Sequence, residues 1–249
     1  MPRNPFNIHN HINKVGDNLY QIQIDDLLPQ NLQIGFGIQS FTQDRLEVQK
    51  TLKGKYGQLV LLRQKHSNKI VVARDQSPKG DFEIRKGDAL ITDKENVVLT
   101  IHTADCLPVL FFADGKAIGA VHAGWRGTVQ GILGQAVSES IRLYKLSTME
   151  IKFIFMPAIL DCCYDVGPEV GVLFDKKSHN KSGKMSIDVA DENRKQLLKM
   201  GVSEKNIIRF DNCTFCDASF NWPSFRKDGK IKRRIINFIT MIGKGENNA

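Results

Sequence analysis

Short apolar runs, separated by polar turn residues, occur along most of this chain and alternate with segments whose apolar residues recur at helical spacing. Such runs are typical of buried strands, and the spaced segments are typical of amphipathic helices. We therefore expect helices over 44–52, from Thr128 to Leu143 with Thr128 as N-cap, and over 189–200. Strands are expected over 32–38, 58–64, 70–73, 89–93, 97–101, 109–113, 117–119, 151–155, 207–210 and 235–241, and an exposed charged loop over 77–85.

Two of these strands predict a β-hairpin in the middle of the chain. The runs 109–113 and 117–119 flank residues 114–116, which read Asp-Gly-Lys, and an Asp-Gly pair between apolar runs is a strong hairpin signal. Such a hairpin brings Cys106, just before its first strand, close to His122, just after its second. A thiol and an imidazole placed this way can bind a metal or form a nucleophile–base pair, and the spacing leaves both open.

Strands and helices interleave to the end of the chain, with no linker rich in proline, glycine or serine between them. We therefore expect one mixed α/β domain, with mixed sheets flanked by helices, over residues 21–243. Residues 1–20 are polar and rich in asparagine and histidine, which predicts a flexible N-terminal arm. Residues 244–249 are expected to form a polar tail.

The 249 residues are 41% hydrophobic and 25% charged, as in an ordinary globular protein. A net charge of +8 suits an anionic ligand such as phosphate, but the basic residues are scattered without a nucleic-acid-binding motif, so no nucleic-acid partner is expected. The N-terminus lacks an apolar signal-peptide core and no segment approaches membrane-spanning length, which predicts a cytoplasmic protein without a membrane partner. Five cysteines, an odd number, argue against a disulfide framework, and no feature specifies the oligomeric state.

His66, Cys106 and His122 each occur at the end of an apolar strand, where side chains from distant segments can converge. Two histidines and a cysteine are a good zinc set, and three protein ligands leave a fourth position for water or substrate. The spacing alone favours three unrelated residues, because the ligands lie 40 and 16 positions apart and fit no compact zinc motif.

Weaker signals occur elsewhere in the chain. Cys213-x-x-Cys216 lacks a second such pair; Cys162 and Cys163 could complete a four-sulfur site with it, but buried small hydrophobes are the default interpretation. Arg126 lies in a glycine-containing loop before a helix, which is a plausible anion site. The basic turn over 224–229 is either an exposed hairpin or the far wall of an anion-binding cleft.

Several motifs together resemble the YfiH-like family, also called the laccase-domain or multicopper polyphenol oxidoreductase family. The resemblance runs from about residue 30 to 240, and two of its central motifs are highly specific. The motifs, in family order, are Gln64-x-His66, Gly87 to Thr92, Thr103 to Leu110, Ala120 to Gly127, Cys163 to Gly167, Asp191-x-Asn193, Cys213-Thr214 and Ser224-x-Arg226.

The resemblance implies a single mixed α/β domain of the YfiH-like fold, which is similar to that of a deamidating toxin domain. It places the family's metal ligands on His66, Cys106 and His122, and so favours zinc over copper as cofactor. Family members are purine nucleoside phosphorylases that cleave adenosine, inosine and methylthioadenosine with inorganic phosphate, and they can also deaminate adenosine. Zinc fits both reactions because it activates water and, with an arginine, can orient phosphate.

Roles for six further residues of these motifs are hypotheses. We assign Arg126 to phosphate and Asp105 to acid–base catalysis or to support of the ligands. The other four candidates would contact the substrate, with an aromatic ring facing the base: Gln64, Trp125, Tyr164 and Arg226.

Three alternatives differ in chemistry. Copper-dependent polyphenol oxidation needs many histidines, whereas this chain has six, with only His9 and His11 in a His-x-His pair. A cysteine hydrolase would use Cys106 as nucleophile and His122 as base, and peptidoglycan editing has been suggested for bacterial members. A non-catalytic nucleoside-binding protein is allowed by three departures from the family pattern, at Met156, residues 38–42 and residues 232–234.

Overall fold

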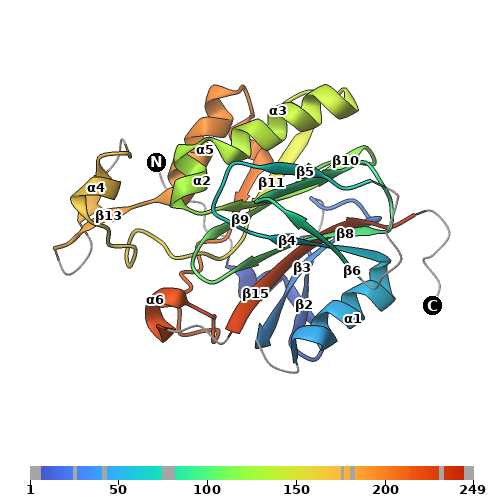
Figure 1. Cartoon of the computed structure of the whole chain (residues 1–249), viewed down its shortest axis with the longest axis horizontal. Coiled ribbons are helices and arrows are strands. Elements are labelled where there is room, and N and C mark those ends of the chain that lie inside the picture. The colour runs from blue at the N-terminus through green and yellow to red at the C-terminus, as the bar shows by residue number, and fades with distance from the viewer. Residues whose placement is uncertain are drawn as a thin grey trace.

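The computed structural model describes residues 7–24, 27–40, 44–74, 82–174, 177–179, 183–229 and 233–243. Its elements form four layers, in which two β-sheets pack face to face and helices cover both outer faces (Figure 1). This arrangement confirms the expected mixed α/β fold with sheets flanked by helices. In the described part of the chain, no helix has both the length and the apolar character needed to cross a membrane.

The seven-stranded sheet is antiparallel as far as its fifth strand and parallel beyond it. Its outer face is covered by α1 (Asp44–Tyr56), from which Val48 and Leu52 pack against Leu59 and Phe238. The strand order is β1 (Ile12–Gly16), β2 (Leu19–Ile22), β3 (Leu32–Ser40), β15 (Arg233–Met241), β8 (Val97–Thr103), β4 (Gln58–Arg63) and β6 (Phe82–Lys86).

The six-stranded sheet has the predicted hairpin at its centre and is covered by α3 (Ile132–Tyr144) and α5 (Val189–Lys199). Its order is β14 (Ile207–Arg209), β11 (Ile151–Phe155), β9 (Leu107–Ala113), β10 (Ala117–Ala123), β7 (Ala89–Thr92) and β5 (Ile70–Val72). The remaining elements are η1 (Ile8–His11), α2 (Trp125–Val129), α4 (Pro168–Gly171), β12 (Lys177–His179), β13 (Met185–Ile187), η2 (Glu204–Asn206) and α6 (Phe225–Asp228).

Apart from His122, the residues of the hairpin strands are apolar because both faces of the strands are buried. Leu110 and Phe112 point into the core between the sheets, whereas Val109 and Phe111 pack beneath the helices. Gly119 lies directly opposite Phe111, and a β-carbon there would come within 2.1 Å of its ring. A larger residue at position 119 would therefore separate the two central strands of this sheet.

The N-terminal segment differs from the flexible arm predicted over residues 1–20. Residues 8–11 form η1; β1 then pairs with β2, and β2 pairs with β3, at the edge of the seven-stranded sheet. Ile8 and Leu19 are fully buried, so a few apolar side chains anchor a segment whose composition is otherwise polar. Residues 1–6 and the predicted tail, 244–249, lie outside the described residues.

Two further expectations are wrong in detail. The helix predicted from Thr128 is divided into α2 and α3 by Gly131, whose φ of 71° is left-handed. Thr128 is not an N-cap; it is buried within α2, and its hydroxyl donates to the carbonyl of Ala123 and accepts from Asn193. The expected loop over 77–85 includes the start of β6, which pairs with β4, while 75–81 lie outside the described residues.

Candidate functional site

Three chain segments meet at the ends of strands from both sheets. Cys106 directly precedes β9, and His122 lies near the end of β10, opposite Pro108 in the hairpin register. His66 follows β4 of the other sheet. The ligand atoms of these three residues all lie within 4.8 Å of one another, and Nε2 of His66 is 3.9 Å from Sγ of Cys106. The structure thus brings together the thiol and both imidazoles that the sequence singled out.

Asp88, between β6 and β7, holds both histidines in place. Its buried carboxylate accepts hydrogen bonds from the backbone N–H groups of Lys65, His66 and Ser67, at 2.8–3.1 Å, and from the Ser67 hydroxyl at 2.6 Å. The same carboxylate lies 2.9 Å from Nδ1 of His122. These contacts fix the orientation of the His122 ring and leave its Nε2 available on the side of Cys106.

The turn that carries His66 is strained. His66 has a φ of 57°, in the left-handed region that residues other than glycine rarely adopt. Its own N–H is one of the donors to Asp88, and its neighbours supply the others. The buried carboxylate therefore stabilises a backbone conformation that directs the imidazole toward Cys106.

Gly124 closes the site from the side of α2. A β-carbon at this position would lie 3.1 Å from Sγ of Cys106 and 3.4 Å from Cδ2 of His66. The distance to sulfur is shorter than an ordinary contact and the distance to His66 is at the lower limit of one, so a side chain here would press on the Cys106 thiol and touch the His66 ring. The glycine lets the helix begin close to the cluster.

The ionisation of the cluster is set by burial and by neighbouring charges. Burial alone would raise the pKa of the Cys106 thiol, but the facing imidazoles of His122 and His66 lower it below its usual value. Burial alone would lower the pKa of His122, but Cys106 and Asp88 raise it. A thiolate beside two imidazoles is a donor set that zinc accepts, and a thiolate–imidazolium pair is also the resting form of a cysteine nucleophile.

The cluster opens into a cleft of about 660 Å³, within the roughly 300–1,000 Å³ typical of small-molecule sites. All of the substrate-binding candidates from the sequence reach its wall. The lining residues are Leu62, Gln64, His66, His102, Thr103, Ala104, Asp105, Cys106, His122, Trp125, Arg126, Ile159, Tyr164, Phe225, Arg226 and Arg234.

Asp105 anchors the wall of the cleft beside Cys106. Its carboxylate is buried, with Oδ1 accepting from the Thr214 hydroxyl at 2.7 Å and Oδ2 accepting from the Arg226 backbone N–H at 2.7 Å. The backbone carbonyl of Asp105 accepts from Ile159. Asp105 therefore ties three distant loops to the segment that carries the Cys106 thiol.

Gln64 has a comparable anchoring role. Its side-chain amide donates to the carbonyl of His102 and accepts from the His102 N–H, each at 2.8 Å. This pair of hydrogen bonds continues the pairing of β4 with β8 beyond the last backbone pair. The side chain reaches the cleft, but both ends of its amide are engaged by the backbone.

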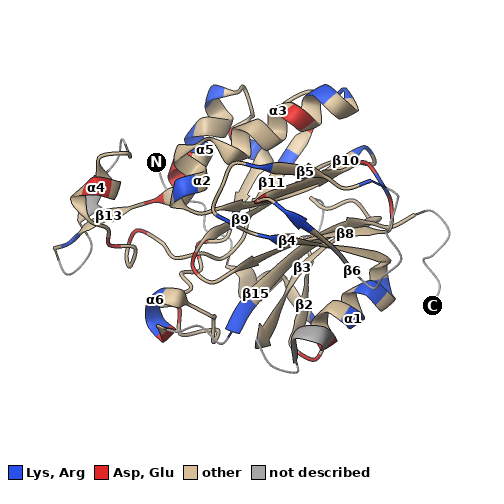
Figure 2. Ribbon diagram, in the orientation of Figure 1, with Lys and Arg blue, Asp and Glu red and all other residues tan. Residues whose placement is uncertain are grey.

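Two arginine–aromatic pairs stand on the rim of the cleft. The Arg126 guanidinium lies 4.3 Å from the ring of Trp125, and that of Arg226 lies 5.6 Å from the ring of Tyr164 and 3.2 Å from Asp165. Among the described residues, Arg126 has no carboxylate partner. Figure 2 shows basic residues on α2, α6 and the start of β15, the elements that carry Arg126, Arg226 and Arg234.

The sequence alone gave no role to Asp88 or Arg234. Asp88 belongs to a Gly-Asp turn, a signal that normally indicates only chain reversal. Its contacts with Lys65, His66, Ser67 and His122 span 21 to 34 positions, and nothing local reveals them. Met156, a departure from the family pattern, is 1% exposed and packs into the core between the sheets rather than the cleft.

Comparison with known proteins gives both sequence and structural relatives. Residues 37–242 match the family described as multi-copper polyphenol oxidoreductase laccase. A purine nucleoside phosphorylase of Aquifex aeolicus is 33% identical over 180 residues, which cover 72% of this chain and 81% of that protein. Adenosine deaminase RL5 of an unknown prokaryotic organism is 33% identical over 174 residues, covering 64% of this chain and 66% of that protein.

The fold has solved counterparts. YlmD from Geobacillus stearothermophilus superposes with a TM-score of 0.78 at 22% identity, covering 93% of this chain and 99% of that one. The Bacillus licheniformis protein YfiH gives the same TM-score and identity, covering 92% and 98%. The match over residues 37–242, together with these relatives, establishes that the chain belongs to the YfiH-like, multi-copper polyphenol oxidoreductase laccase family.

Proposed function

We propose that this protein is a zinc-dependent purine nucleoside phosphorylase that cleaves adenosine, inosine or methylthioadenosine with inorganic phosphate. The observation that carries the proposal is the cluster of His66, Cys106 and His122 at the base of a cleft with arginines on its wall. The phosphorylase relative, which shares 33% identity over most of its length, supports the same reaction class.

The donor set fits a single zinc ion. Nε2 of His66, Sγ of Cys106 and Nε2 of His122 would hold it, and the hydrogen bond from Nδ1 of His122 to Asp88 is the outer support that zinc-binding histidines usually have. When bound, zinc would supply a Lewis acid and would lower the pKa of water. Copper is the less suitable occupant, because one three-residue cluster lacks the several histidine-rich sites of a multicopper oxidase.

The arginines would bind the anionic reactant. Arg126 is exposed on the helix that begins beside the cluster, and Arg234 lies on the wall of the same cleft. Guanidinium groups bind phosphate oxygens through paired, charge-assisted hydrogen bonds. We assign Arg126 to phosphate, with Arg234 as a second contact, whereas Arg226 is partly neutralised by Asp165.

The aromatic residues would hold the purine. Trp125 and Tyr164 both line the cleft, and their rings can pack against a planar base. Burial raises the pKa of Tyr164, so its hydroxyl stays protonated and can donate a hydrogen bond. Asp105 and Gln64, whose polar atoms are already engaged by protein groups, would act as positioning residues for this wall.

The test is a product assay on protein of known metal content. Adenosine and phosphate are incubated with the protein before and after chelation, and adenine, inosine and ribose 1-phosphate are quantified. Chelator-sensitive ribose 1-phosphate supports the proposal, and inosine alone would make the protein chiefly a deaminase, the activity named for one relative. Absence of both products from zinc-replete protein would contradict it.

A cysteine hydrolase is the second candidate, because Asp88, His122 and Cys106 form a connected acid–base–thiol line. In that enzyme His122 would take the proton of the Cys106 thiol, and Asp88 would orient the imidazole. A bound metal would block the thiolate. Hydrolysis of a cell-wall muropeptide that increases on chelation would favour this candidate over the phosphorylase.

A further inference from the structure

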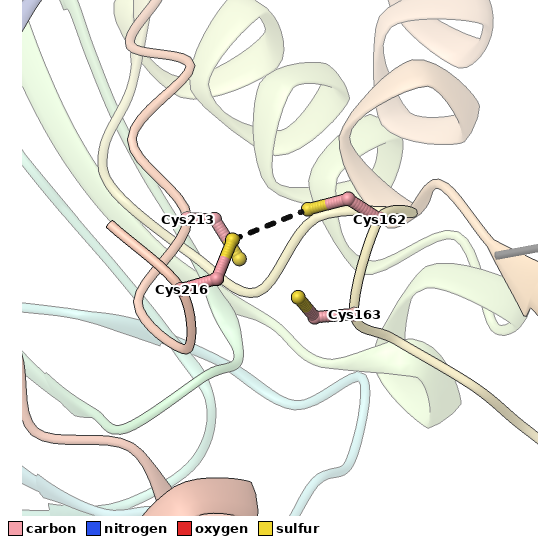
Figure 3. Close-up of side chains that lie close together, drawn as sticks. All are labelled: Cys162, Cys163, Cys213 and Cys216. Atoms are coloured by element: carbon pink, nitrogen blue, oxygen red, sulfur yellow. Dashed lines mark hydrogen bonds between the residues drawn. The ribbon is translucent and has the colours of Figure 1, made fainter. Parts of the chain in front are cut away.

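Four of the five cysteines form a second cluster, separate from Cys106. Cys162 and Cys163 lie on the loop after β11, and Cys213 and Cys216 lie on the loop after β14. Figure 3 shows the four sulfur atoms pointing toward a common centre between these two loops. All four lie within 4.8 Å of one another, and Sγ of Cys162 is 3.7 Å from Sγ of Cys216.

We propose that Cys162, Cys163, Cys213 and Cys216 bind a structural zinc ion through four thiolates. This site is distinct from the cluster in the cleft and does not depend on the proposed phosphorylase activity. Four-coordinate sites made of protein ligands alone leave no position for water or substrate, so their role is to stabilise structure.

The sulfur separations fit one tetrahedral ion. Zinc–sulfur bonds of about 2.3 Å in tetrahedral geometry place the sulfur atoms about 3.8 Å apart, close to the 3.7 Å between Cys162 and Cys216. A disulfide would need a pair of sulfurs at about 2.05 Å, whereas all five cysteines of this chain are free. An iron–sulfur cluster, which places several irons and sulfides between its cysteines, requires wider separations.

The two loops also pack together around the sulfur atoms. Cys213 is buried in a small apolar cluster with Ile159 and Leu160, against which Cys162 and Cys163 pack. Four unlinked thiols that converge in such a setting form the donor set of a structural zinc site.

The cluster is placed to brace the cleft. Cys163 is followed by Tyr164, and Cys213 is followed by Thr214, whose hydroxyl donates to the Asp105 carboxylate next to Cys106. The two loops also meet through the bridge between Ala158 and Cys213 and the hydrogen bond from the Thr214 N–H to the Ala158 carbonyl. A zinc ion would join them with four strong bonds directly behind the cleft wall.

The experiment uses the full chain, purified under reducing conditions without added metal, in wild-type, Cys106→Ser and Cys216→Ser forms. Cys216 is exposed, so its replacement by the similarly sized serine changes packing little. Zinc per chain is measured in each form, together with the circular dichroism spectrum. Cys216→Ser should hold about one zinc less than wild type, and Cys106→Ser should keep about one zinc at the cysteine cluster.

X-ray absorption at the zinc edge of Cys106→Ser gives a readout that does not depend on folding of a cluster variant. A first shell of about four sulfurs at about 2.3 Å is expected. Folded Cys106→Ser without zinc, a shell that contains nitrogen, or a mass lower by two hydrogens per disulfide would overturn the proposal. If only the phosphorylase proposal is wrong, zinc-replete wild type will form no ribose 1-phosphate, but the shell of four sulfurs will still be present.

Discussion

The two cysteine-containing clusters differ in how many donors they offer and in what surrounds them. The cluster in the cleft has three donors, His66, Cys106 and His122, and opens into about 660 Å³ of space. The cluster behind the cleft wall has four donors, all sulfur, contributed by two loops. The three-donor cluster, called here the open cluster, can bind substrate beside a metal ion. The four-donor cluster, the closed cluster, has no free position and can only stabilise the fold. Zinc would thus have a catalytic role in the open cluster and a structural role in the closed cluster of the same chain.

The largest effect is expected from breaking the open cluster. His122→Ala should lower the kcat/KM of phosphorolysis by about a thousand-fold or more, because a metal ion contributes several kcal/mol to charge stabilisation. Steady-state assays with adenosine and phosphate measure the loss. His102→Ala is the matched control, since His102 lines the same cleft outside the donor set. Equal losses in both variants would contradict the assignment of His122 as ligand.

The second-largest effect is expected from replacing Asp88, which supports the ligands of the open cluster. Asp88→Asn weakens the hold on His122 and on the strained turn at His66, so zinc affinity should fall about 10- to 100-fold. Competition with a chromogenic chelator measures the affinity. Asp93→Asn should leave the affinity unchanged, because this half-exposed carboxylate directly follows β7, at the opposite end of the strand from Asp88. An unaltered affinity in Asp88→Asn would show that the carboxylate does not orient the ligands.

Substrate binding can be separated from the metal at Arg126. Arg126→Ala should raise the KM for phosphate about 10-fold while zinc content stays at the wild-type value, because a hydrogen bond to a charged group contributes about 1.5–3 kcal/mol. Initial rates at varied phosphate give the KM. Arg142→Ala, an exposed arginine paired with Glu139 on α3, is the control. An unchanged phosphate KM in Arg126→Ala would remove this residue from the anion site.

The smallest effect on chemistry is expected from the closed cluster. Cys216→Ser should lower the Tm by about 5–10 °C, as for a loss of about 2–3 kcal/mol in a domain of this size. Its kcat should fall less than about 10-fold, because the three donors in the cleft are untouched. Thermal unfolding and activity are measured on one preparation. A kcat loss as large as that of His122→Ala would abolish the distinction between the clusters.

The parts of the fold predicted correctly are those with strong local signals. The central hairpin is visible because both of its faces are buried, so each strand is an uninterrupted apolar run around an Asp-Gly turn. The N-terminal strands have no such local signal, because only isolated positions such as Ile8 and Leu19 are buried there. The pairing of β2 with β3 stabilises this segment, and the propensity of its residues does not reveal that contact.

The residues of the candidate site likewise differ in how clearly the sequence indicates them. The ends of apolar strands indicated His66, Cys106 and His122, because strand ends are where side chains converge. Asp88 was not recognised, since its role depends on contacts with residues 21 to 34 positions away. The sequence indicates the four-sulfur cluster only weakly, because two pairs of cysteines about 50 positions apart converge through the folding of two loops.

The most direct measurement is made on Cys106→Ser beside wild type, with zinc content and ribose 1-phosphate determined on the same samples. We expect Cys106→Ser to keep about one zinc, at the closed cluster, and to form no ribose 1-phosphate, whereas wild type should bind about one zinc more and form ribose 1-phosphate. Wild-type rates in a Cys106→Ser sample that has lost zinc from the cleft would contradict the account.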